Sequence, residues 1–97
     1  MASLSWTLEA ERWLQDIHDY IAADNPLAAN QTIQGIYDRA QLLQDFPESG
    51  YRYWASARNV HILLYGHYRI TYLIAGNGSI EILGVFHGAL DLSKYEL

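Results

Sequence analysis

The chain has no cysteine among its 97 residues, which excludes both a disulfide framework and a thiolate metal site. It has a single lysine, Lys94, and its formal net charge of −5 disfavours direct nucleic-acid binding. No apolar run approaches the roughly 20 residues that a membrane-spanning helix needs. The first residues lack the charged and apolar regions of a secretion signal. We therefore expect a cytoplasmic protein without a membrane partner.

Motifs of common catalytic and cofactor sites are also missing. The four histidines lie far apart and follow no metal-binding pattern such as H-E-x-x-H, so we expect no metal. The sequence has no Gly-rich phosphate loop and no Ser/His/Asp arrangement, and we expect no cofactor. The glycine-rich residues 76–78 indicate a turn rather than a binding loop.

The residues that are present indicate one packed domain over residues 1–97. Apolar residues make up 51% of the chain and aromatic residues 13%, which is enough for a small core. The charge is uneven, with a net −6 through Glu48 and a net +1 after it. We interpret the acidic half as a solvent-exposed helical face.

Two amphipathic helices are predicted in the acidic half. Thr7 suits the N-cap of the first helix, and Asn25 followed by Pro26 suits the start of the second. Phe46 and Pro47 end the second helix. Gly35 predicts a close approach by a neighbouring backbone. Apolar residues at three- and four-residue spacing form the inward stripes, which are Ala10, Trp13, Leu14, Ile17, Tyr20 and Ile21, and then Ala29, Ile33, Ile36, Tyr37, Ala40 and Leu43.

Three strands are predicted in the second half, over residues 60–65, 68–75 and 79–87. Gly66 stands at the first central position of a two-residue turn, which favours type II′ and an antiparallel hairpin. The third strand is apolar on both faces, so we expect it to be central in the sheet. Residues 3–6 form a further short strand, and its sheet edge is left open.

These elements predict an α+β fold in the order β-α-α-β-β-β. The short link between the helices makes them an antiparallel helical hairpin. Neither stripe is buried by one helix alone, so the hairpin packs on one face of an antiparallel sheet. Residues 48–59 link the two layers, and the tail after Gly88 forms either a short helix or a mobile end.

His87 is one candidate for chemistry, because it ends the central strand at the rim of the sheet. It is either an acid/base or phosphate-contacting group, or a histidine bonded to a nearby carbonyl. His61 and Arg69 do not form a joint site in this prediction. Hairpin pairing places His61 opposite Tyr72, so Arg69 points to the other face.

The linker is the second candidate, because aromatic and arginine residues alternate in it. Such a segment stacks on bases, anchors a protein interface, or folds over the edge of the core. Because the chain has only one lysine, we favour a protein interface. The residues concerned are Tyr51, Arg52, Tyr53, Trp54 and Arg58.

The order and spacing of these pieces resemble the ParE/RelE toxin superfamily of type II toxin–antitoxin systems, and its ParE branch most closely. The final strand ends in His-Gly-Ala-Leu-Asp, similar to the family's HGARD signature. The other matching pieces are residues 10–20, the step at 25–29, the FPESG linker at 46–50, and the hairpin at 60–61 and 66–72.

The resemblance implies a toxin that binds proteins, is neutralised by a cognate antitoxin, and has DNA gyrase as a candidate target. A RelE-like, ribosome-dependent mRNA endoribonuclease is one alternative. A detoxified relative that retains only an interaction role is another. Leu90 replaces the signature arginine, and His61 stands where the family often has arginine, which disfavours the ribonuclease.

The resemblance also assigns site residues under each hypothesis. The partner-binding candidates are Arg52, Trp54, Arg58, Arg69 and Tyr95, with His61 and His87 beside them. For the ribonuclease alternative, His87 is the acid/base, and the phosphate is placed by Arg58, His61 or Arg69.

Overall fold

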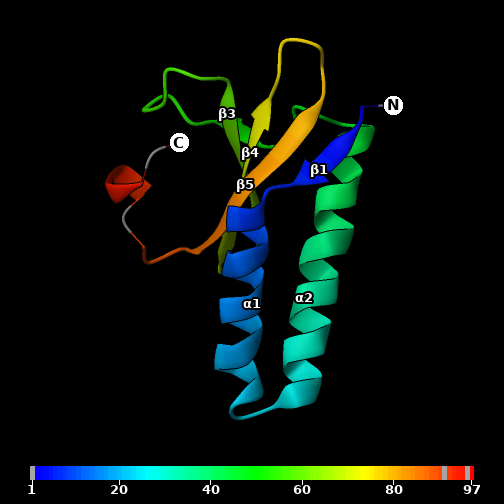
Figure 1. Ribbon diagram of the computed structural model, residues 1–97, viewed down its shortest axis with the longest axis vertical. Helices are drawn as coiled ribbons and strands as arrows, with labels where there is room; N and C mark the ends of the chain where they lie inside the picture. Colours follow the sequence, from blue (N-terminus) through cyan, green and yellow to red (C-terminus); the bar gives the residue numbers. More distant parts are fainter. Residues whose placement is uncertain (1, 91, 96) are drawn as a thin grey trace.

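A helical hairpin packs against one face of a five-stranded sheet (Figure 1). This computed structural model describes residues 2–90, 92–95 and 97. The strand order is β1-β5-β4-β3-β2, which confirms the predicted α+β fold. The elements are β1 (Leu4–Trp6), α1 (Leu8–Ala22), α2 (Pro26–Gln41), η1 (Leu42–Gln44), β2 (Tyr51–Arg52), β3 (Val60–Tyr65), β4 (Tyr68–Ile74), β5 (Ile80–His87) and η2 (Leu92–Lys94).

Both helices begin where the sequence predicts. Thr7 Oγ1 accepts a hydrogen bond from Ala10 N (3.1 Å), and Asn25 Oδ1 accepts one from Ala28 N (3.1 Å). Pro26 is the first residue of α2, where its missing N–H leaves no helical bond unmade. Side-chain caps of this kind satisfy backbone donors that have no partner inside the helix.

The meander of β3, β4 and β5 is confirmed. Tyr65 pairs with Tyr68 across a two-residue turn, and the φ of Gly66 is 57°, as a type II′ turn requires. β5 lies between β4 and β1, as its two apolar faces predict. β1 runs parallel to β5, with Leu4 opposite Ile80, so the sheet is mixed and not purely antiparallel. The sequence left open which edge of the sheet the first strand joins, and the structure places it at the β5 edge.

The linker contains a strand that the sequence did not indicate. β2 pairs antiparallel with β3 at the outer edge of the sheet, with Tyr51 opposite Ile62. Two residues are too few to show a strand period. The pairing fixes where the loop of residues 53–59 leaves the sheet.

The main core lies between the hairpin and the sheet. The predicted surroundings of two helical residues, Tyr20 and Gly35, are wrong. Tyr20 is 84% exposed, because the end of α1 projects beyond the sheet (Figure 1). A Cβ on Gly35 would lie 1.8 Å from Tyr65 Oη, so a side chain, and not the predicted backbone, approaches this glycine. The buried core residues are Ala10, Leu14, Ile36, Ala40, Leu43, Leu63, Ile70, Tyr72, Ile80, Ile82 and Val85.

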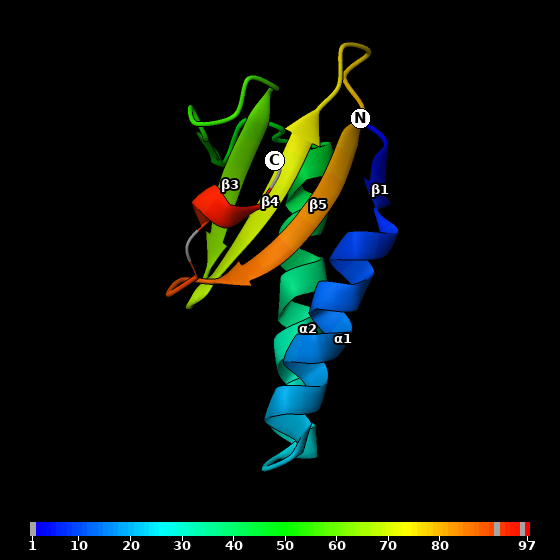
Figure 2. The ribbon, with the colours of Figure 1, turned by 60° about the vertical axis from the view of Figure 1, so that its left-hand side comes forward.

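The tail lies over the opposite face of the sheet (Figure 2). Leu92 of η2 packs there with Ile62 and Phe86, so of the two alternatives for the tail a short helix is observed. Asp91 of the HGARD-like stretch lies outside the described residues. The acidic residues through Glu48 are all exposed, which confirms the solvated face. Among the described residues, neither helix is long and apolar enough to cross a membrane.

Candidate functional site

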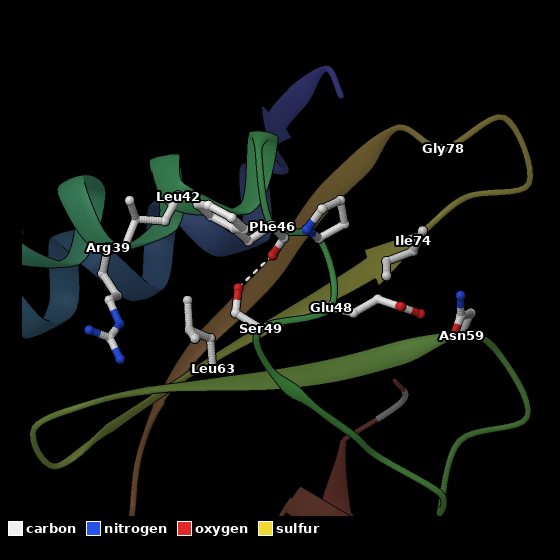
Figure 3. A pocket seen from close by; sticks show the side chains of 10 residues that line it. Arg39, Leu42, Phe46, Glu48, Ser49, Asn59, Leu63, Ile74 and Gly78 are labelled. Carbon is white, nitrogen blue, oxygen red and sulfur yellow. Dashed lines mark hydrogen bonds between the residues drawn. The ribbon is translucent and has the colours of Figure 1, made fainter. Parts of the chain in front are cut away.

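An apolar groove opens between the end of α2 and the sheet (Figure 3). Its volume is 840 Å³. Leu42 and Phe46 stand on the helical side and are 49% and 64% exposed, whereas Leu63 belongs to the sheet. The groove is lined by Arg39, Leu42, Phe46, Pro47, Glu48, Ser49, Asn59, Leu63, Ile74 and Gly78.

Tyr72 holds the linker that forms one wall of the groove. Its hydroxyl accepts a hydrogen bond from Gly50 N (3.0 Å) and donates one to Pro47 O (2.7 Å). The side chain is fully buried, so the hydroxyl needs these partners. Burial raises the pKa of Tyr72 and the charge of Glu48 adds to this, while the Gly50 bond acts in the opposite direction.

His61 supports the same linker. It is 7% exposed, and its Nε2 lies 3.0 Å from Asn59 Oδ1 and its Nδ1 3.4 Å from Gly50 O. The imidazole stacks on Tyr72 with ring centroids 5.5 Å apart. Each ring nitrogen therefore faces a protein oxygen, and the N–H of the imidazole donates to one of them, which ties the side chain to the linker.

His87 lies at the far end of the sheet and is exposed. Its Nδ1 accepts a hydrogen bond from Ala89 N (3.2 Å), and its ring lies near those of His67 (6.3 Å) and Tyr68 (5.8 Å). A cavity of 310 Å³ is lined by these residues and by Arg69. Sequence reasoning missed His67, although its place in the turn before β4 brings it close to the end of β5.

Arg69 holds the turn that follows β5. Its Nη2 donates hydrogen bonds to the carbonyl oxygens of His87 (3.3 Å) and Leu90 (2.5 Å). The register pairs Arg69 with Leu64 and Tyr72 with His61, which confirms that Arg69 and His61 lie on opposite faces.

The structure does not bring the three catalytic candidates together. His61 pairs with Tyr72 and His87 pairs with Tyr68, four positions away along β4. Four residues of strand span roughly 13 Å. Arg58 lies in the loop after β2 and lines a cavity under the tail.

Three partner-binding candidates do meet. The Arg52 guanidinium carbon lies 4.5 Å from the centre of the Trp54 ring, and Arg52 Nη2 donates to Arg58 O (2.9 Å). Trp54 is 79% exposed. Tyr95 instead packs on Phe86, with ring centroids 5.0 Å apart, beneath the far face of the sheet. The roles of these side chains stay predictions.

The model of the family "ParE toxin of type II toxin-antitoxin system, parDE" matches residues 4–92. The chain belongs to this ParE toxin family. The match spans every residue of the groove and the end of β5. The predicted ParE/RelE resemblance is therefore confirmed.

Known ParE and RelE proteins resemble the chain along nearly its whole length. Toxin RelE2 of Caulobacter vibrioides is 33% identical over 89 residues, which cover 92% of this chain and 98% of that protein. The structure of the chromosomal ParDE system from P. aeruginosa matches with a TM-score of 0.75 and 26% identity, over 90% of this chain and 96% of that one. The toxin–antitoxin complex RelBE2 of Mycobacterium tuberculosis has a TM-score of 0.64 at 19% identity, over 89% and 90%, and shows the shared fold.

Proposed function

We propose that this ParE-family toxin acts by binding a protein, with DNA gyrase as the candidate target. The separation of His61, His87 and Arg58 supports binding over RNA cleavage. Acid/base catalysis needs its groups within hydrogen-bond reach of one reacting centre. His61 is further removed from catalysis because it is buried and its ring nitrogens face the protein oxygens of Gly50 and Asn59.

We assign the groove to a segment of a cognate antitoxin. The ParDE and RelBE2 structures are toxin–antitoxin systems, which supports such a partner. Leu42 and Phe46 offer an apolar wall, and Arg39 offers a cation at the rim. An amphipathic segment with a carboxylate facing Arg39 fits this combination.

Phe46→Ser tests the groove directly. Phe46 is 64% exposed, so the substitution changes the free energy of unfolding little and removes an anchor for the antitoxin. We expect the antitoxin affinity to fall about tenfold or more, which is about 1.4 kcal/mol. Calorimetry with the cognate antitoxin measures it. Leu27→Ser, at a 67% exposed position far from the groove, is the control, and an equal loss in both variants removes the assignment.

Induced expression of the unmodified chain in a bacterial host tests the mode of action. Filamentation with DNA damage is the expected result and supports gyrase as the target. Rapid arrest of translation with cut mRNA supports the RelE-like alternative. Normal growth supports a detoxified relative.

The ribonuclease alternative has one observation in its favour. The cavity at the end of β5 brings His67, Tyr68, Arg69 and His87 together. In that case His87→Ala abolishes mRNA cleavage and leaves the fold intact, because the side chain is exposed. Unchanged cleavage removes His87 from the assignment.

A further inference from the structure

Strand β2 and the residues that join it to β3, together residues 51–59 and here called the loop, are cationic on an otherwise acidic chain. Residues 51–59 contain Arg52 and Arg58 and no acid, so removing their +2 from the net −5 leaves −7 for the remainder. Trp54 stands between these arginines and is 79% exposed. Tryptophan and arginine are the residue types most enriched among the residues that dominate binding energy at protein interfaces.

The loop is fixed in place rather than loosely exposed. Arg52 spans it, with its guanidinium over Trp54 and a hydrogen bond to Arg58 O (2.9 Å). Ser56 is 8% exposed, donates to the carbonyl of Leu97 and accepts from Arg58 N (3.1 Å). A side chain that is oriented before binding loses less entropy when a partner arrives. The loop therefore presents Trp54 in a prepared position.

Most of this loop lies on the tail side of the sheet, where Tyr53, Ser56 and Ala57 line a cavity with Ser93 and Tyr95, and only Asn59 at its end lines the groove. Figure 3 shows the groove between the helices and the sheet, with the loop descending past the other side. Arg58 lines a cavity with Phe86 and Tyr95, which belong to the face under the tail. Trp54 is not among the residues that line the groove, so we expect it to stay accessible when an antitoxin segment binds there.

We propose that residues 51–59 are the docking surface for an acidic patch on the target protein, with Trp54 as the apolar anchor and Arg58 as the charge contact. The inference rests on the proposed function. Charge complementarity selects an acidic partner for this +2 loop. Nucleic acid fits less well, because the Arg52 guanidinium covers one face of the indole on which a base would stack.

Loop variants and matched controls test this surface. Trp54→Ala and Arg58→Glu are compared with Tyr20→Ala and Arg12→Glu, which make the same kinds of change at exposed positions on α1. We expect both loop variants to raise survival under induced expression about tenfold or more, with antitoxin affinity within about twofold of the unmodified chain. The controls and Arg58→Lys keep full growth arrest, because they retain the loop's charge and its indole. Circular dichroism checks that each variant is folded. If Trp54→Ala unfolds, the comparison of growth arrest between Arg58→Glu and Arg58→Lys tests the docking surface alone.

The other outcomes overturn the inference in distinguishable ways. Full growth arrest by both loop variants removes the docking surface and leaves the proposed function intact. Loss of antitoxin affinity assigns the loop to the antitoxin instead. Binding of a fluorescently labelled single-stranded RNA, lost in Arg58→Glu, assigns it to nucleic acid. Normal growth with the unmodified chain overturns the proposed function, and this inference with it.

Discussion

At the scale of single residues, the Tyr72 hydroxyl joins β4 to the linker through Gly50 N and Pro47 O. The sequence predicts that Tyr72 pairs with His61 but does not identify the partners of the Tyr72 hydroxyl, which lie more than twenty positions away. A tyrosine predicted to be buried in a strand indicates that some hydrogen-bond partner for its hydroxyl exists, but not which residue supplies it. His61 shows the same limit, since its partners Gly50 and Asn59 depend on the path of the linker.

Tyr72→Phe leaves both linker groups without their hydroxyl partner. We expect a loss of about 1 to 3 kcal/mol in the free energy of unfolding at pH 7, measured with urea. The pKa of Tyr72 is raised in the folded state, so the folded chain keeps a proton that the unfolded chain loses above about pH 10. Native stability of the unmodified chain therefore falls as pH rises through that range, and its advantage over Tyr72→Phe shrinks. An advantage that grows with pH contradicts this account.

At the scale of elements, the capped helices and the three-stranded meander follow from patterns within the sequence. Caps, a 3.6-residue period and a glycine turn each have a local cause. β2 and the groove have no such local signal. They arise where the linker leaves η1, is held by Tyr72 and pairs with β3, so they depend on contacts between distant segments. Sequence reasoning therefore identified the layers and missed the groove between them.

Gly50→Ala tests how β2 is seated. A Cβ there would lie 2.6 Å from Ile62 O and 2.8 Å from Ile62 C, and backbone atoms of a sheet do not move aside easily. We expect a loss of about 1 to 3 kcal/mol in unfolding free energy, together with weaker antitoxin binding as the groove wall shifts. Gly76→Ala is the matched control, because no heavy atom lies within 4 Å of its Cβ position, and it should change stability by less than about 0.5 kcal/mol. Equal effects of the two substitutions contradict the seating of β2.

At the scale of the whole molecule, the two proposed binding surfaces lie on different sides of one sheet. The groove beside the hairpin is apolar with Arg39 at its rim, and the loop that carries Trp54 lies on the side of the tail. The exposed acidic residues of the helices cover neither the groove nor the loop. Such an arrangement suits a toxin that acts by binding, because His61 and His87, the two histidines proposed for catalysis, pair with residues four positions apart along β4.

Growth arrest by the His67→Ala/His87→Ala double variant tests this central claim most directly. Both side chains are exposed, so the variant keeps its fold while losing the two histidines at the end of β5. Induced expression is followed by growth curves and by mapping of mRNA ends. A toxin that works by binding arrests growth as strongly as the unmodified chain, with intact mRNA in both. Loss of arrest in the variant, together with cut mRNA from the unmodified chain, contradicts the account.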